Sequence, residues 1–411
     1  MIIRSSRMPR REFIRSGAVG LAGAALAPIA AGRKRPAPGA SCPSSGFPER
    51  VLGKTGLSLP IVSIGANSYD PDLYRQALDS GLRHIDTSSD YQNGNHERVV
   101  GRAIKGRPRD SFVIATSFAT HRFQDRRKRV FNADTPTAPL IQSFEGSLRR
   151  LGLDCVDIFY LAWMCSRETT LYEPYLRVLE KFKQEGKARF IGITTHENEP
   201  EVLRTAAAAK VYDVVLTVFN FRQVHREDVQ KAIAEAAGAG VGIVAMKTQA
   251  GASWDRRAAG EVNMSAALKW VLRDKNVHTT VPGITTYGQL RADLAILENP
   301  ALTEDEKAGL EKMSRLPYIF SSLFCQQCGQ CLPQCPRGLD VPTLMRSYMY
   351  AYGYKDPAKA KEALARADLA SVPCGECASC RVRCSVGFNV RAKALNVIRL
   401  AGVPDGFLFR G

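Results

Sequence analysis

The stretch DVVLTVFNFRQVHREDVQKAIAEAAGAGVGIVAM, residues 213–246, decides the fold class of this chain. It begins with an apolar run (213–219), continues through an amphipathic segment of helical length (226–240) and ends with a second apolar run (242–246). Short apolar runs that are bounded by polar turns predict buried strands, and an intervening helix is typical of parallel strands. The stretch therefore predicts a strand–helix–strand unit of an α/β protein.

The same alternation of apolar runs and helical segments extends well beyond this unit. Apolar runs occur at eight places: 59–65, 83–88, 112–116, 156–163, 189–194, 213–219, 242–246 and 278–283. Eight such units predict a (β/α)8 TIM barrel. A doubly wound sheet is the alternative, but no G-x-G-x-x-G turn follows the first strand. Barrel enzymes carry their reactive side chains in the loops that follow the strands, so those loops hold the candidate site.

Eight of the eleven cysteines lie in two short groups near the C-terminus. Residues 325–336 read CQQCGQCLPQCP and residues 374–385 read CGECASCRVRCS, so both have the spacing C-x2-C-x2-C-x3-C. This run is typical of proteins with two [4Fe–4S] clusters, in which the fourth cysteine of each group binds the other cluster. Structural zinc is the weaker interpretation, because zinc sites favour two separated cysteine pairs. The predicted ligand sets are Cys325, Cys328, Cys331 and Cys384 for one cluster, and Cys374, Cys377, Cys380 and Cys335 for the other.

The segment between the two cysteine groups contains two helical patterns, at residues 341–354 and 356–369. They predict a small α-helical ferredoxin-like domain rather than a compact β-rich one. The predicted domain organisation is a signal peptide (1–32), a Pro/Ser/Gly linker (33–48), a barrel (49–318) and a ferredoxin-like domain (319–411).

The N-terminal residues resemble a twin-arginine export signal. Residues 1–35 hold eight basic residues and one acidic residue, a net charge of +7 out of +17. Paired Arg10 and Arg11 precede a short Gly/Ala-rich stretch (17–31), although Pro9 stands where the signal usually has Ser or Thr. A surface amphipathic helix is the alternative. The signal predicts a periplasmic or otherwise extracytoplasmic protein, with the twin-arginine translocation machinery as a partner.

The remaining composition argues against several classes of partner. Basic residues outside the N-terminus are scattered, which does not indicate nucleic-acid binding. A membrane-spanning helix needs about 18 consecutive apolar residues, and the sequence contains no such run. No membrane span is therefore expected. Cys42 follows Gly-Ala-Ser, which lacks the large apolar residue of a lipoprotein signal, so a lipid anchor is disfavoured.

Three motifs resemble the aldo/keto reductase family, and together they span roughly residues 50–300. They are GLRHIDTSSDYQNGNHERVVGRAI (81–104), IGITTHE (191–197) and VPGITTYGQL (281–290). The resemblance implies NADPH-dependent reduction of a small carbonyl compound, or the reverse reaction on an alcohol. The cysteine groups make the whole layout similar to the iron–sulfur branch of that family.

The catalytic tetrad that the resemblance implies is incomplete. Asp86 and Tyr91 match the family's aspartate and its proton-donating tyrosine. Ser117 stands at the position of the lysine that makes the tyrosine acidic, and Ala162 at that of the histidine that orients the carbonyl. Without the lysine, the nearby carboxylate would raise the tyrosine pKa. Lys247, directly after the seventh strand, is the candidate replacement, ahead of the loop histidines His121, His196 and His225.

The nucleotide-binding pattern of the family also lacks several of its residues in this sequence. Met246 stands where the family stacks a tyrosine on nicotinamide, and Ala292-Asp293 where Glu-Asn holds adenine. These departures weigh against NADP(H), the cofactor that the resemblance implies. The remaining candidate cofactor-binding residues are Asn220, Thr194, Thr195, Gly283 and Arg291.

The sequence favours an exported iron–sulfur oxidoreductase of the aldo/keto reductase type. The first alternative is an electron-transfer protein that docks a redox partner on a non-catalytic barrel. The second is a protein whose clusters only stabilise the C-terminal fold, since metal binding couples to folding.

Overall fold

The computed structural model describes residues 46–66, 68–125, 128–249, 263–315, 323, 325, 329–353, 356–371, 373–377, 379–385 and 387–408. Residues 39–411 form one compact unit. The predicted signal peptide, most of the predicted linker, Cys42 and Cys328 lie outside the described residues.

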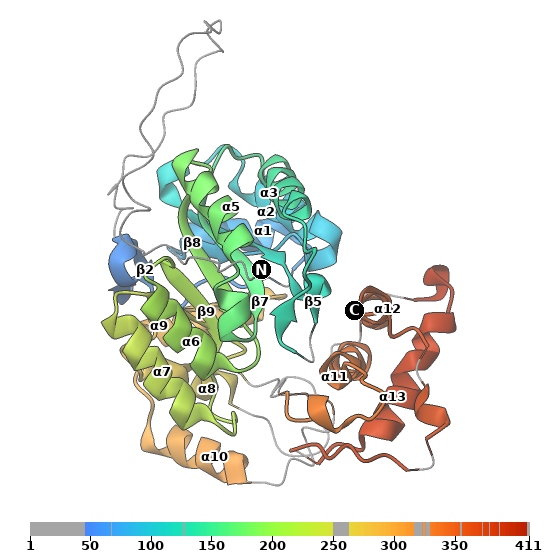
Figure 1. The fold of residues 1–411 in the computed structure, drawn as a ribbon. Coiled ribbons are helices and arrows are strands. Elements are labelled where there is room, and N and C mark those ends of the chain that lie inside the picture. Colours follow the sequence, from blue (N-terminus) through green and yellow to red (C-terminus); the bar gives the residue numbers. More distant parts are fainter. Residues whose placement is uncertain are drawn as a thin grey trace, which may run out of the picture. The chain divides into compact units, whose positions relative to one another are not determined.

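The main sheet is a curled parallel sheet with the strand order β11-β10-β9-β8-β7-β4-β3 (Figure 1). Its strands are β3 (His84–Asp86), β4 (Val113–Ala119), β7 (Val156–Met164), β8 (Ala188–Thr195), β9 (Val214–Val218), β10 (Gly242–Met246) and β11 (Thr279–Thr280). The first predicted strand lies between the two edges, because Val62 bridges Thr280 and Ile64 bridges Ile85. The predicted (β/α)8 barrel is thus confirmed.

The strand–helix–strand unit at residues 213–246 has the predicted form. Strands β9 and β10 pair in parallel, with Gly242 opposite Val214, and α7 (Arg226–Gly238) connects them. Glu227 and Asp228 lie in the first turn of α7, where acidic side chains stabilise a helix. The helices around the barrel are α1 (Pro71–Asp79), α2 (Asn95–Ile104), α3 (Ala138–Leu151), α4 (Arg167–Thr170), α5 (Glu173–Gln184), α6 (Glu199–Ala209), α7, α8 (Met264–Leu272), α9 (Tyr287–Glu298) and α10 (Glu304–Arg315).

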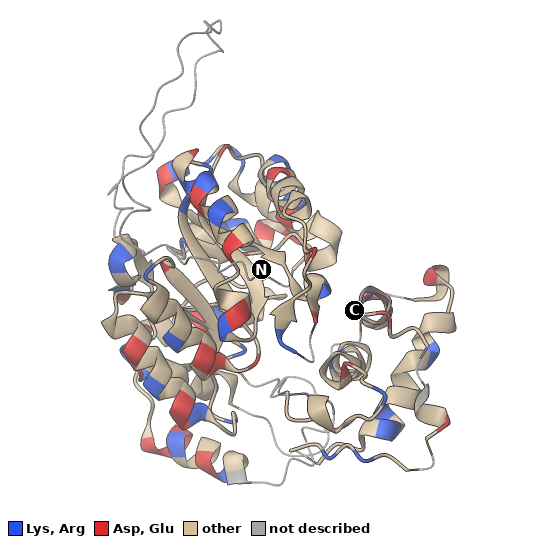
Figure 2. Ribbon diagram, in the orientation of Figure 1, with Lys and Arg blue, Asp and Glu red and all other residues tan. Residues whose placement is uncertain are grey.

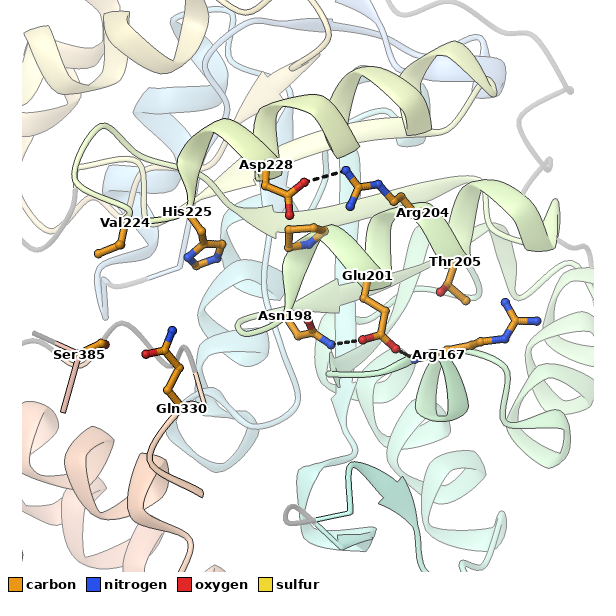
Figure 3. Close-up of a pocket in the computed structure, with 11 residues that line it drawn as sticks. Arg167, Asn198, Glu201, Arg204, Thr205, Val224, His225, Asp228, Gln330 and Ser385 are labelled. Carbon is orange, nitrogen blue, oxygen red and sulfur yellow. Dashed lines mark hydrogen bonds and ion pairs between the residues drawn. The ribbon is translucent and has the colours of Figure 1, made fainter. Parts of the chain in front are cut away.

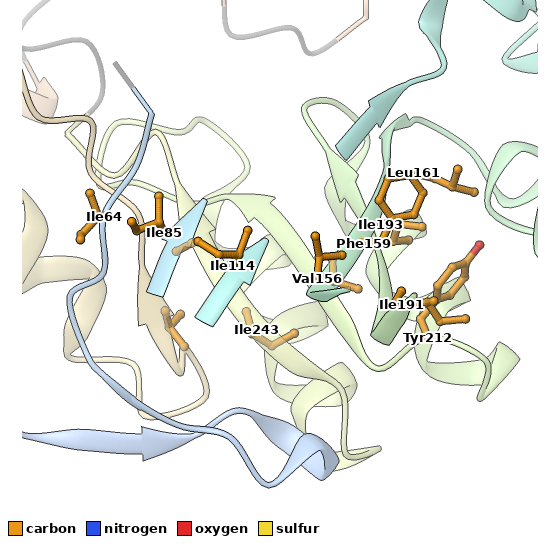
Figure 4. Close-up of a cluster of buried hydrophobic side chains, with 14 of the residues drawn as sticks. Ile64, Ile85, Ile114, Val156, Phe159, Leu161, Ile191, Ile193, Tyr212 and Ile243 are labelled. Atoms are coloured by element: carbon orange, nitrogen blue, oxygen red, sulfur yellow. The ribbon is translucent and has the colours of Figure 1, made fainter. Parts of the chain in front are cut away.

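Two layers of apolar side chains form the barrel core. The outer layer packs the sheet against the helices and includes Ile85, Phe159 and Ile243 (Figure 4). The inner layer fills the barrel and includes Tyr160 and Val244. Such packed layers make a barrel interior a core rather than a channel.

A hairpin that the sequence did not predict, β1 (Glu49–Val51) with β2 (Ser58–Pro60), covers the end of the barrel where the strands begin. Leu52 of this hairpin belongs to the inner layer and lies so close to Gly242 that a Cβ there would come within 2.6 Å of it. The other end, where the strands finish, is called the mouth below. A second short hairpin, β5 (Gln124–Asp125) with β6 (Val130–Phe131), follows β4.

The C-terminal segment is helical, as predicted. It contains α11 (Val341–Tyr348), a π-helical turn (Met349–Gly353), α12 (Pro357–Arg366) and α13 (Val390–Ile398). These helices share a core of their own that includes Leu344, Leu364 and Ala394, and Cys335 is buried in it.

Charged residues of both signs alternate along the outer helices (Figure 2). This agrees with the scattered basic residues of the sequence. Within the described part of the chain, no helix combines the length and apolar character that a membrane crossing needs.

Candidate active site

Asp86 and Tyr91 both lie at the mouth, as their positions after the second predicted strand imply. Asp86 ends β3 and is 5% exposed. Its Oδ2 atom has no hydrogen-bond partner among the described residues. Burial raises the pKa of Asp86 to about 8, so its carboxyl group is largely protonated at neutral pH. Tyr91 begins a short 3-10 turn, and its backbone N–H donates to the carbonyl of Ser88 at 3.2 Å.

Tyr160 is a functional candidate that the sequence reasoning missed. It lies in β7 opposite Ser117 of β4, and its buried hydroxyl has no hydrogen-bond partner in the described structure. Burial and the neighbouring carboxyl of Asp86 raise its pKa well above the usual value. Gly192 makes room for this ring, because a Cβ at that position would come within 2.7 Å of it. A neutral phenol therefore lies near Asp86, on the strand next to Ser117.

His96 is a second residue that the sequence reasoning missed, and its ring packs against the ring of Tyr91. The Tyr74 hydroxyl lies 2.6 Å from its Nε2 atom, and the Thr87 hydroxyl lies 2.7 Å from its Nδ1 atom. Its ring meets the Tyr91 ring edge-on, with the centroids 6.1 Å apart. Burial and the positive charge of Lys359 lower the pKa of His96 to about 4. His96 is therefore a neutral positioning residue.

Lys247 lies where the sequence placed it, directly after β10 at the mouth. Its backbone adopts a left-handed conformation, with φ of 56°. Burial lowers the pKa of Lys247. The nearby Tyr350 side chain partly offsets this shift electrostatically, whereas the positive charge of Arg346 lowers the pKa further. Lys247 therefore lies beside the C-terminal helical segment.

Two of the three candidate histidines pack against the ring of Trp163. His196 stacks on its ring with the centroids 3.8 Å apart, and His121 meets it at an angle at 5.4 Å. The third, His225, pairs instead with Glu199, with Nε2 and Oε2 2.8 Å apart. Two of these histidines thus pack against Trp163, and the third pairs with Glu199.

Three candidate nucleotide-binding side chains make hydrogen bonds within the protein. Thr194 accepts from the backbone N–H of Trp163 at 3.2 Å, and Thr195 donates to the carbonyl of Glu197 at 2.7 Å. The amide oxygen of Asn220 accepts from a backbone N–H two residues on, at 3.1 Å. These side chains are thus held by internal bonds.

The segment expected to hold phosphate and adenine is also altered. Gly283 bridges Gly65 as part of the barrel closure, and Arg291 is exposed on α9. Asp293 is buried, which raises its pKa to about 7. A buried carboxyl group thus occupies the position of an adenine-binding asparagine. At Asp293 the chain thus departs from the pattern by which the family holds NADP(H).

The described cysteines support the predicted cluster ligands. The neighbouring thiols that, with burial, raise the pKa of Cys374 are Cys335, Cys377 and Cys380. This is the predicted second ligand set, including the cysteine contributed by the other group. No three His, Cys, Asp or Glu side chains in the described ranges are arranged around a single metal ion. Cys374 and its three neighbouring thiols would supply the four thiolates that a [4Fe–4S] cluster needs, so the donor set fits such a cluster.

A cavity of about 580 Å³ lies beside the cysteine-rich segment (Figure 3). Gln330 and Ser385 reach it from that segment, and they adjoin Cys331 and Cys384, which belong to one predicted ligand set. An ion pair between Arg204 and Asp228 at 2.8 Å stands on its barrel side. The other lining residues are Arg167, Asn198, Pro200, Glu201, Thr205, Val224 and His225.

Comparison with protein families gives a match in each part of the chain. Residues 66–265 match the model of the aldo/keto reductase family. Residues 324–389 match the 4Fe-4S dicluster domain.

Two curated relatives each match less than half of this chain. An aldo-keto reductase of Mycolicibacterium smegmatis is 28% identical over 162 residues, which cover 38% of this chain and 52% of the relative. The L-glyceraldehyde 3-phosphate reductase of Escherichia coli K12 is 30% identical over 164 residues, covering 36% and 46%. The chain thus spans about half the length of the curated relatives it matches.

Solved structures share the barrel fold. An aldo-keto reductase from Bacillus halodurans, in its holo form, superposes with a TM-score of 0.51 at 22% identity, covering 65% of this chain and 96% of that one. An aldo/keto reductase from Klebsiella pneumoniae, in complex with NADP and acetate, gives 0.51 at 22% identity, covering 64% and 94%.

Proposed function

We propose that this chain is an exported iron–sulfur oxidoreductase that acts on a small carbonyl or alcohol substrate at the mouth of its barrel. One observation carries the proposal: helices between the two cysteine groups contact the candidate site. Lys359 Nζ of α12 lies 5.7 Å from the centroid of the Tyr91 ring, and Arg346 of α11 lies 4.4 Å from that of Trp163. The match of residues 66–265 to the aldo/keto reductase family supports the substrate class.

The clusters, rather than NADP(H), serve as the electron carriers in this proposal. The eight cysteines would hold two [4Fe–4S] clusters, each of which exchanges one electron when bound. The Klebsiella enzyme binds NADP, but the internal bonds of Thr194 and Thr195 and the buried carboxyl of Asp293 oppose the same contacts here.

Export by the twin-arginine route is part of the proposal. Arg10 and Arg11 and the Gly/Ala-rich stretch that follows support it. Free NADPH is not expected outside the cytoplasm, so cluster-borne electrons also suit this location.

A second candidate function is electron transfer to a partner protein that docks beside the clusters. The cavity bordered by Gln330 and Ser385 favours it, because these residues adjoin predicted cluster ligands. In this case the barrel mouth would not bind a reacting substrate.

The test is a cluster reoxidation experiment with anaerobically purified full-length protein. The clusters are reduced chemically, small aldehydes, ketones and oxo acids are added in turn, and visible absorption follows the oxidation state. At least one carbonyl compound is expected to reoxidise the clusters, and Arg346→Gln should slow this step more than Arg381→Gln at an exposed position. Failure of every carbonyl compound would favour the electron-transfer candidate. A parallel NADPH titration is expected to leave the nicotinamide fluorescence unchanged.

A further inference from the structure

Four residues gather at the mouth and are called the mouth group here: Lys247, Arg346, Tyr350 and Lys359. Lys359 Nζ lies 4.7 Å from the centroid of the Tyr350 ring and 5.7 Å from that of Tyr91. Lys247 comes from the end of β10, whereas the other three come from the C-terminal segment. Lys359 thus lies against the Tyr350 ring, and the charges of Arg346 and Lys247 also act on this phenol. The barrel and the cysteine-rich segment both contribute to the arrangement.

The backbone around the mouth group departs from regular geometry at three places. Lys247 and Trp163 have φ angles of 56° and 74°, which are costly for residues other than glycine. Tyr350 lies in the π-helical turn Met349–Gly353. Left-handed residues and π-helical turns are concentrated at functional sites, where the surrounding structure maintains them. Two members of the mouth group, Lys247 and Tyr350, thus lie in backbone of this kind, as does Trp163 beside Arg346.

The electrostatics of the mouth group favour negative charge. Burial raises the pKa of Tyr350 and Asp90 adds to that effect, but Lys359, Arg346 and Lys247 together outweigh both, so the pKa of the phenol is lowered. A position that stabilises a phenolate will also stabilise another anionic oxygen.

The members of the mouth group differ in exposure. Lys247, Tyr350 and Lys359 are each partly exposed, while Arg346 is buried, with 4% of its surface exposed. The buried Arg346 is fixed by a hydrogen bond from its Nη2 atom to the hydroxyl of Thr343 at 2.9 Å. The mouth group therefore combines one rigid guanidinium with two lysines that can adjust to a ligand.

We propose that the mouth group binds the carboxylate of a small oxo or hydroxy acid. The inference rests on the proposed function for the carbonyl or alcohol chemistry, and it narrows the substrate to acids of this class. A carboxylate accepts charge-assisted hydrogen bonds from guanidinium and ammonium groups, which are stronger than bonds between neutral groups. A bound carboxylate would raise the pKa of the neighbouring Tyr350 phenol, so Tyr350 would keep its proton and supply a further donor. A bound acid would place its carbonyl or hydroxyl carbon near Tyr91, since Lys359 lies against both tyrosine rings.

The test compares ligands that differ in charge but not in shape. Pyruvate and pyruvamide, and lactate and lactamide, are titrated into the full-length protein with its clusters in place. Calorimetry measures the affinity, and tryptophan fluorescence reports on Trp163 beside Arg346. Each acid is expected to bind at least about tenfold more tightly than its amide, a difference of about 1.4 kcal/mol.

Lys359→Gln should remove most of that preference. Lys361→Gln is the matched control on the same helix, because Lys361 binds Asp405 and the carbonyl of Val403 instead. Tyr350→Phe is a second, conservative variant and should weaken acid binding without abolishing it. Equal affinity for acid and amide, absent binding of both acids, or equal effects of the two lysine variants would overturn the inference. Binding is measured without turnover, so acid binding with no cluster reoxidation would refute the proposed function and leave the inference standing.

Discussion

The guanidinium carbon of Arg346 lies 4.4 Å from the centroid of the Trp163 ring, so a buried cation of α11 rests on the end of β7. His196 stacks on the same indole at 3.8 Å. Residues from distant parts of the chain thus form one layered contact. It joins the helices between the cysteine groups to the mouth of the barrel.

Arg346→Ala should weaken this contact. A desolvated cation–π pair contributes about 2 kcal/mol, so the free energy of unfolding of the C-terminal helices should fall by about that amount. Urea titration followed by tryptophan emission measures the loss. Arg381→Ala, at an exposed position in the same segment, is the control and should change little. Equal effects of the two substitutions would mean that the contact adds no stability.

Asp86 should make the protein less stable as the pH rises. Its pKa is about 8 in the folded protein and about 3.9 in an unfolded chain. Between these values the folded state holds a proton that the unfolded state has released, so the free energy of unfolding falls with rising pH, by about 1.4 kcal/mol for each pH unit. Asp86→Asn should remove this slope and make the protein more stable at alkaline pH than the unsubstituted chain.

Urea unfolding across this pH range measures the effect of Asp86→Asn. Asp134→Asn, in an exposed loop, serves as the control and should keep the slope of the unsubstituted protein. An infrared band of a protonated carboxyl group should also be lost in Asp86→Asn at neutral pH. Retention of both the slope and the band would show that another group is responsible.

The barrel could be predicted from the sequence because burial imposes local periodicity. The helix predicted at 226–240 begins at the predicted residue and ends two residues early, and β10 coincides with its predicted run at 242–246. The β1–β2 hairpin was missed since its strands have three residues each, too few to show an alternating pattern.

The candidate site was only partly predictable. Asp86 and Tyr91 belong to one contiguous motif, so a local pattern revealed them. Tyr160 carried a weak signal, as a polar aromatic residue at an inward position of an apolar strand. The approach of Arg346 and Lys359 to the mouth depends on how the C-terminal helices pack, and local spacing carries no information about contacts between residues so distant in sequence.

Cys374→Ser should remove one cluster and retain the other. The thiols of Cys335, Cys377 and Cys380 neighbour Cys374, so all four should bind the same cluster. The iron content of the purified protein should fall from about eight to about four atoms per chain. Metal analysis and visible absorption measure the change, and Cys155→Ser, in the barrel, should keep the full content. Unaltered iron in Cys374→Ser would exclude the predicted ligand set.

The His225–Glu199 pair should stabilise the protein more at acidic than at alkaline pH. The hydrogen bond that protonated His225 donates to the Glu199 carboxylate raises the pKa of His225 despite partial burial. The resulting stabilisation is fully present below the unfolded pKa of about 6.5 and is lost as the pH rises through the folded value. Glu199→Gln should therefore lower the free energy of unfolding at acidic pH, by about 1–3 kcal/mol for a buried charge-assisted hydrogen bond, and should lower the His225 pKa. Proton NMR of the imidazole and urea unfolding at two pH values measure both effects.

Glu201→Gln, at an exposed position of the same cavity, is the control and should leave the His225 pKa unchanged. An equal pKa shift in both variants would mean that the charges around the cavity as a whole, rather than Glu199, raise the His225 pKa.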